Sequence, residues 1–232
     1  MKHHLKILLL LCITLYSCKK ENIPTGGASL NIILATEDIP SLYTYFTSNP
    51  SSFFNQQSPL YSLTGMEYPL PSGNSTLSLV SSADTTHSLF QTSLNLANGG
   101  IYSFYFFGNA PKFDTLLLKD TIPIIKDSSA GVRFIDLASG NSSFKIVQEV
   151  TDPIIPDTIN LANRQISPFK NYPVTPDLPG FYNFDIYDRS SGSFITTITW
   201  YYTLYKNNTI VIFGSQDPSS PTPVSSFQVN NY

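Results

Sequence analysis

Residues 28–46 read ASLNIILATEDIPSLYTYF, and residues 130–147 read AGVRFIDLASGNSSFKIV. Both stretches contain an apolar segment of strand character, then a polar turn, then a segment in which apolar and polar residues alternate. Their first residues, Ala28 and Ala130, lie 102 positions apart. Such self-similarity at a fixed spacing indicates two copies of one structural unit.

Two further pairs of segments extend the repeat. Residues 68–82 (YPLPSGNSTLSLVSS) correspond to residues 175–192 (TPDLPGFYNFDIYDRSSG), with Leu-Pro and a glycine before a strand in each copy. Residues 99–109 (GGIYSFYFFGN) correspond to residues 206–216 (KNNTIVIFGSQ), where a hydrophobic strand ends in Phe-Gly. The copies are offset by 108 residues at the Leu-Pro proline and by 106 at the Phe-Gly glycine, as loop insertions would cause.

The period of the hydrophobic pattern indicates the fold class. Apolar and polar residues alternate in residues 75–80, 143–147 and 181–187, and helix signals are nearly absent after the first 17 residues. Each copy contains about seven short strands bounded by Gly, Pro, Asn and Ser. The sequence therefore predicts two tandem immunoglobulin-like antiparallel β-sandwich domains, residues 28–124 and 129–232, with the boundary within residues 122–129.

The N-terminus predicts the cellular localisation of the protein. Lys2 and Lys6 precede the apolar residues 7–16, which are too few to span a bilayer and are typical of a secretory signal. Residues 15–18, LYSC, resemble the bacterial lipobox. The resemblance implies that residues 1–17 are removed and that the mature chain begins at Cys18 with lipid on its sulfur. Residues 18–27 then form a flexible tether.

Charge and cysteine content exclude several classes of protein. Cys12 leaves with the signal and Cys18 carries lipid, so no disulfide, zinc cluster or cysteine nucleophile is expected. Without Lys2 and Lys6 the mature chain has 11 basic and 16 acidic residues, a net charge of −5. Nucleic-acid binding therefore has little electrostatic support.

The repeated segments resemble the domain of unknown function numbered 4397. Pro40 corresponds to the turn proline of that family, residues 70–73 (LPSG) to its V-P-A-G turn, and residues 102–108 to its Y-T-V-F-x-x-G strand. The resemblance covers nearly the whole mature chain, although residues 137–143 (LASGNSS) lack the Asp-x-Pro turn of the family and the region 150–173 is longer. It implies a secreted or lipid-anchored bacterial protein and leaves the function open.

Catalytic chemistry has few candidates. His87 is the only histidine after the signal, and no glycine-flanked serine lies near it in the sequence. A histidine-rich metal site is excluded by this count. Most aspartates lie beside turn residues, where they usually bond their own backbone. We therefore predict no catalytic residue, no metal site and no cofactor, and we predict that the protein is not an enzyme.

Two groups of residues are candidates for binding or modification. Trp200 and Tyr202 share one face of a predicted strand, where they either stack on a ligand or belong to the sandwich core. Four Asp-Thr triplets resemble the O-glycosylation acceptor pattern of Bacteroidetes-type bacteria, or else cap turns. Their threonines are Thr85, Thr115, Thr121 and Thr158.

These observations predict a lipid-anchored protein of the bacterial cell envelope, on the outer membrane, with the periplasmic or surface face and the oligomeric state left open. The leading hypothesis is a non-enzymatic module for adhesion, assembly or ligand display, with a protein or glycan partner. The second is a carbohydrate-binding accessory lipoprotein, which predicts that Trp200 and Tyr202, or a similar aromatic pair, are coplanar and exposed to solvent. The third is an envelope hydrolase, which predicts His87 or two aspartates converging in a cleft.

Overall fold

The computed structural model describes residues 26–36, 38–46, 58–149, 157–177, 179–217 and 219–231. The predicted signal, Cys18 and most of the tether lie outside these ranges. Every regular element that the described residues form is a β-strand, and the strands build four four-stranded sheets. The predicted all-β fold with two sandwiches is confirmed. In the part of the chain that is described, no helix is long and apolar enough to cross a membrane.

The first sandwich consists of an inner and an outer sheet. The inner sheet contains, in spatial order, β4 (Thr64–Pro71), β1 (Gly27–Ala35), β7 (Ile101–Asn109) and β8 (Lys112–Lys119). The outer sheet contains, again in spatial order, β3 (Leu60–Tyr61), β2 (Ser41–Phe46), β5 (Gly73–Ser81) and β6 (Ser88–Leu96). Residues 120–128 lead from this sandwich to the second.

The second sandwich repeats this arrangement strand for strand. Its inner sheet contains β12 (Lys170–Pro173), β9 (Ser129–Asp136), β15 (Asn207–Phe213) and β16 (Ser225–Asn231). Its outer sheet contains β11 (Thr158–Ala162), β10 (Ser143–Gln148), β13 (Phe181–Asp188) and β14 (Phe194–Tyr201). The sequence repeat is therefore also a repeat of topology.

The sandwiches differ from the predicted pattern in two details. Each has eight described strands rather than about seven. In each, the first strand pairs parallel with the seventh, β1 with β7 and β9 with β15, whereas the remaining ladders are antiparallel as predicted. The parallel pair is compatible with the connections, because β1 and β9 each continue into a strand of the opposite sheet rather than into a hairpin.

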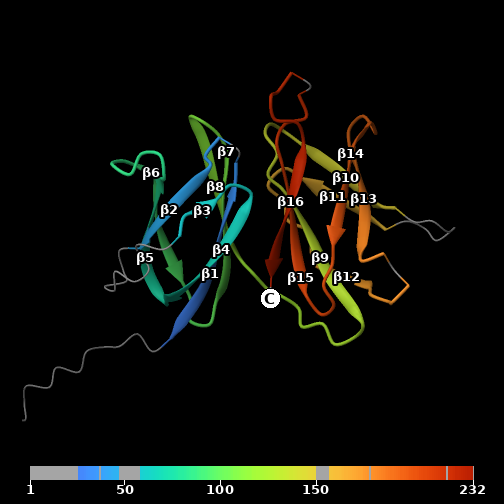
Figure 1. The fold of residues 1–232 in the computed structure, drawn as a ribbon, viewed down its shortest axis with the longest axis horizontal. Coiled ribbons are helices and arrows are strands. Elements are labelled where there is room, and N and C mark those ends of the chain that lie inside the picture. The colour runs from blue at the N-terminus through green and yellow to red at the C-terminus, as the bar shows by residue number, and fades with distance from the viewer. Residues whose placement is uncertain are drawn as a thin grey trace, which may run out of the picture.

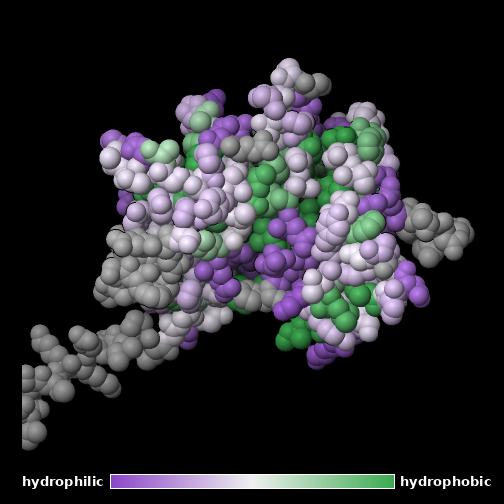
Figure 2. Space-filling model, in the orientation of Figure 1, coloured by the Kyte–Doolittle hydropathy of each residue, from purple (hydrophilic) through white to green (hydrophobic). Residues whose placement is uncertain are grey.

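The four sheets form four layers, with the two inner sheets facing each other (Figure 1). A third apolar core lies between these inner sheets, in addition to the core inside each sandwich. Its buried members are Ile33, Ala35, Tyr105, Phe107, Ile135, Leu137, Val211 and Val229. In the space-filling view, hydrophobic side chains are visible in the seam between the sandwiches, beside a hydrophilic patch (Figure 2).

This third core explains why some strands lack the alternation of a half-buried strand. All residues of β9 and β15 are buried, and β7 is buried over most of its length. Successive side chains point to opposite faces, so one set fills the sandwich core and the other set fills the space between the sandwiches. The apolar runs "FYFF" in β7 and "IVIF" in β15 follow from burial on both faces.

A buried ion pair crosses from the connecting segment to the second sandwich. Arg133 Nη1 lies 2.8 Å from Asp120 Oδ1, and both side chains are almost completely buried. Ser103 Oγ of β7 also donates to Asp120, at 2.6 Å, while Arg133 Nε donates to Thr209 Oγ1 at 2.9 Å. These hydrogen bonds satisfy much of the charge in the interior. Asp120 therefore connects Ser103 of the first inner sheet with Arg133 of the second inner sheet.

The backbone conformation explains why each copy of the repeat has glycine in its Phe-Gly motif. Gly108 and Gly214 adopt positive φ angles of 92° and 90°. A Cβ atom on Gly108 would lie 2.7 Å from the carbonyl oxygen of Lys112, and one on Gly214 would lie 2.2 Å from that of Pro223. Only glycine fits at the ends of β7 and β15.

Candidate ligand-binding face

Trp200 is not the exposed stacking residue that the second hypothesis predicted. Its side chain is 0% exposed, and its indole Nε1 donates to Asn208 Oδ1 at 3.0 Å. The indole packs against Tyr172 and Tyr182 in the core of the second sandwich. Tyr202 shares this side, as the alternation predicted, and is partly buried against Tyr182. Of the two alternatives that the sequence left open, Trp200 therefore takes the core position, because this side of β14 is the core side.

The opposite side of β14 is exposed and carries the aromatic side chains of interest. Tyr201 is 66% exposed, and its ring lies 6.0 Å from that of Phe181 on β13. At the other end of the same two strands, Phe194 is 57% exposed and its ring lies 5.7 Å from that of Tyr187. Each end of the β13–β14 ladder therefore carries one exposed ring beside a half-buried ring, and the rings of each pair are not coplanar, with interplanar angles of 60° and 74°.

Between these pairs the ladder is polar and hydrogen-bonded. Thr199 Oγ1 donates to Asn183 Oδ1 at 3.0 Å, and Thr197 Oγ1 donates to Asp185 Oδ1 at 2.7 Å. Asn183 Nδ2 also donates to Glu149 Oε2, at 2.8 Å. These contacts hold the amide and the carboxylates in fixed orientations, while each retains further hydrogen-bonding capacity toward solvent. We call this surface the aromatic-ended face: Phe181, Asn183, Asp185, Tyr187, Phe194, Thr197, Thr199 and Tyr201.

The length of the aromatic-ended face suits an extended ligand. Phe181 and Tyr187 lie six residues apart on β13, which corresponds to roughly 20 Å at the rise of a strand. Phe181, Asn183, Asp185 and Tyr187 alternate with the core residues of β13. Asn183 and Asp185 are polar and lie on the same side of β13 as Phe181 and Tyr187. The sequence therefore contained a signal that this side faces solvent, and the sequence-based prediction missed it.

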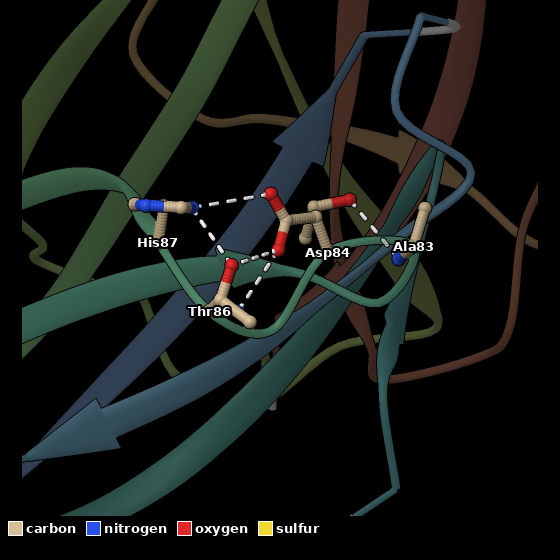
Figure 3. Close-up of polar contacts among 5 residues, drawn as sticks. Ala83, Asp84, Thr86 and His87 are labelled. Atoms are coloured by element: carbon tan, nitrogen blue, oxygen red, sulfur yellow. Dashed lines mark hydrogen bonds and ion pairs between the residues drawn. The ribbon is translucent and has the colours of Figure 1, made fainter.

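His87 lies in an open turn between β5 and β6 rather than in a cleft. Its side chain is 84% exposed, and its Nδ1 lies 3.4 Å from Asp84 Oδ2 and 2.7 Å from Thr86 Oγ1 (Figure 3). The Thr86 hydroxyl and backbone N–H both donate to Asp84 and lower the pKa of this carboxyl group. This is the hydrogen-bonding pattern of an Asx turn. It lacks the enclosure that the hydrolase hypothesis requires of His87.

Two aspartates do line one cleft, between the β13–β14 turn and the segment that follows β15. The cleft has a volume of about 630 Å³, and Asp188 and Asp217 are among its lining residues. Hydrogen bonds from the Ser190 hydroxyl and the Ser191 backbone lower the pKa of Asp188 to about 2. The Ser219 hydroxyl and backbone N–H lower the pKa of Asp217. A glycosidase needs one carboxyl group with a raised pKa as its acid, so this pair fits ligand binding better than acid catalysis.

The four candidate O-glycosylation threonines differ in accessibility. Thr85, Thr121 and Thr158 are exposed, whereas Thr115 is half-buried in β8. The aspartates of their triplets have structural partners: Asp114 pairs with Arg164, Asp120 with Arg133, and Asp157 with Lys170. Glycosylation of these threonines stays a prediction. Among the described residues, no group of three or more His, Cys, Asp or Glu side chains is arranged to hold a metal ion.

No family model matches the chain, and no curated protein matches it. Among solved structures, the chain is similar to the family 26 carbohydrate-binding module of Eubacterium rectale Amy13K, crystallised with maltoheptaose. The identity is 16% over 87% of this chain and 96% of that one, with a TM-score of 0.25. A leucine-rich repeat protein of Bacteroides thetaiotaomicron matches at 10% identity over 80% of this chain and 26% of that one, with a TM-score of 0.22. TM-scores this low carry no functional argument.

Proposed function

We propose that the protein is a non-enzymatic, lipid-anchored component of the bacterial cell envelope that binds carbohydrate chains through its aromatic-ended face. The observation that carries the proposal is the order of side chains along β13 and β14. An aromatic pair with one exposed ring lies at each end, and a ladder of amide, carboxylate and hydroxyl groups lies between the pairs.

This order matches the chemistry of a sugar chain. A pyranose ring has a C–H face that packs on the electron-rich face of an aromatic ring. Its rim carries hydroxyl groups that both donate and accept hydrogen bonds. Asn183 and Asp185 offer planar groups to such hydroxyls, and their orientations are already fixed by Thr199 and Thr197. This preorganisation reduces the entropy that binding costs.

A protein partner fits the face less well. Protein interfaces concentrate their aromatic anchors at a desolvated centre and place polar residues at the rim. Here the centre is polar, and the aromatic pairs of Tyr201 and Phe194 lie at the two ends. The arrangement favours a ligand that alternates apolar faces with hydroxyl groups over its whole length.

The first sandwich and the N-terminus provide the attachment in this proposal. Cys18 carries the lipid, the tether leads to β1, and the first sandwich holds the second through the apolar core between the inner sheets. β13 and β14 belong to the outer layer that is farther from the first sandwich (Figure 1), and the aromatic-ended face is their side opposite the sandwich core. Two or more acyl chains anchor a protein stably.

A glycan array tests the binding proposal. The mature chain with Cys18→Ser, which cannot be lipidated, is compared with the same chain carrying Phe181→Ala and Tyr201→Ala. We expect the first to bind a set of linear glycans and the second to lose that binding while its thermal unfolding temperature is unchanged. Equal binding by both chains would contradict the proposal.

The lipid anchor is tested separately. We expect the native protein to partition into the detergent phase of Triton X-114 and to show the mass of the peptide from Cys18 plus diacylglycerol and an acyl chain. Cys18→Ser should move the protein to the aqueous phase. A wild-type protein that stays in the aqueous phase would contradict lipidation.

A further inference from the structure

The cleft beside β14 continues the aromatic-ended face around the edge of the outer sheet. Phe194 belongs to both surfaces: its ring packs against Tyr187 on the face, and it lines the cleft together with Thr196. Asp188, which follows Tyr187 on β13, lines the cleft as well. A chain that lies on the face can therefore enter the cleft without leaving the protein surface.

The cleft offers acceptors with fixed orientations. Four donors from Ser190 and Ser191 bond to Oδ1 of Asp188. Two donors from Ser219 bond to Oδ1 of Asp217. In both carboxylates these bonds use one oxygen, so among the described contacts Oδ2 remains available. A carboxylate oxygen in this position can accept hydrogen bonds from the hydroxyl groups of a sugar.

The cleft also has an unsatisfied donor and an apolar part. Gln216 lines the cleft, and its Nε2 is buried without a hydrogen-bond acceptor among the described residues. An unpaired buried donor is costly, and a ligand oxygen that reached Nε2 of Gln216 would relieve that cost. Val224 and Ile195, which pack with the core of the sandwich, supply apolar surface beside these groups.

We propose that this cleft holds one end of the bound carbohydrate chain, and that the sugar it accepts is neutral or carries an amine. The proposal rests on the proposed function. Asp188 and Asp217 place two negative charges at the cleft, and no lysine or arginine is among its described lining residues. The charge of an acidic sugar would be repelled there, whereas neutral hydroxyl groups and ammonium groups find acceptors.

Binding of defined oligosaccharides tests the proposal. The probes are cello-, malto- and chitosan oligosaccharides and oligogalacturonates of two to seven residues, titrated calorimetrically into the mature chain with Cys18→Ser. The variants are Asp217→Asn and Gln216→Ala for the cleft, and Phe181→Ala with Tyr201→Ala for the face. Asp177→Asn, an exposed aspartate outside the cleft, is the matched control.

We expect each cleft variant to lower the affinity for a neutral or amino-substituted chain by about tenfold, since one charged or polar hydrogen bond is lost. Asp217→Asn should in addition reduce the discrimination against oligogalacturonates, which a purely structural role would not change. Full affinity in both cleft variants, with binding lost in the face variant, would overturn the cleft proposal and leave the proposed function standing. Absence of wild-type binding to every probe would overturn both.

Discussion

The outer sheets of the two sandwiches share one backbone plan and differ in the side chains at the two ends of one ladder. In the second sandwich, Phe181 pairs with Tyr201 at one end of the ladder and Tyr187 pairs with Phe194 at the other. At the corresponding positions the first sandwich has Asn74 opposite Asn95, and Val80 opposite Ser88. The middle of the ladder is polar in both, with Thr76 opposite Ser93 matching Asn183 opposite Thr199. The same fold thus carries aromatic ends in only one copy, which shows that a site is defined by side chains placed on a fold.

In the inner sheets, by contrast, equivalent positions of the two copies carry similar side chains. Ile33 and Ile135, and likewise Phe107 and Phe213, occupy equivalent places in the two copies and are all buried. Each inner sheet covers the apolar face of the other, so both copies must stay hydrophobic there. The outer sheets face solvent and are free of this constraint.

The largest expected effect on stability is the difference between substitutions on the two sides of β14. Trp200→Ala should destabilise the protein by about 3–5 kcal/mol, because it opens a cavity and removes the partner of Asn208. Tyr201→Ala, one residue further on, should change the free energy of unfolding by about 0.5 kcal/mol or less and should weaken glycan binding. Urea unfolding of both variants checks this. Similar destabilisation by the two substitutions would contradict the assignment of core and ligand sides.

The second prediction concerns the contact between the inner sheets. Asp120→Ala should cost about 3–5 kcal/mol, because it leaves Arg133 charged and buried without its partner. Asp114→Ala removes an ion pair with Arg164 at the exposed end of the same contact and should cost about 1 kcal/mol or less. Denaturant unfolding gives both values. Equal costs would show that the buried pair is not important for joining the sandwiches.

A third prediction uses one position where the inner sheets differ. Asp136 is fully buried where the first copy has the buried Leu34. Burial raises the pKa of Asp136 to about 6, against hydrogen bonds from Ala138 N and Ser142 Oγ that lower it. The folded state therefore keeps this proton to higher pH than the unfolded state, and the stability from this group falls as pH rises from about 4 to 6.

Between the ordinary pKa of an aspartate and the raised pKa of about 6 for Asp136, the decrease in stability amounts to roughly 3 kcal/mol. Asp136→Asn should be stabilised relative to the wild type more strongly at pH 7 than at pH 4.5. Urea unfolding at both values measures this difference. A constant difference between the variant and the wild type would contradict the raised pKa.

The smallest expected effect comes from transferring the aromatic ends. Asn74→Phe with Asn95→Tyr should give the first sandwich a weak binding surface. In a background that carries Phe181→Ala and Tyr201→Ala, this transfer should recover a few-fold to about tenfold in affinity, or about 1 kcal/mol. Calorimetric titration with the glycan that binds the wild type measures the recovery. No recovery would show that the comparison of the outer sheets omits an essential group.

Particular residues show how far the sequence predicts this molecule. The repeat, the two sandwiches and the glycine turns follow from alternation and from the Phe-Gly and Leu-Pro motifs, because these patterns are local. The alternation also placed Trp200 and Tyr202 on one side of β14, but the side that is buried depends on contacts with Tyr172 of β12 in the opposite sheet and with Phe184 of β13. The contact of the inner sheets, including Arg133 with Asp120, joins parts of the chain that are separate in the sequence. Its only local signal in the sequence is that some strands are apolar at nearly every position.

The most direct test of the central claim is a crystal structure of the mature chain with the linear glycan that it binds most tightly on the array. We expect sugar rings stacked on Phe181 or Tyr201 and on Tyr187 or Phe194, with hydroxyl groups bonded to Asn183 and Asp185. A glycan bound to the outer sheet of the first sandwich, or in the seam between the sandwiches, would contradict the claim that the second outer sheet is the binding face.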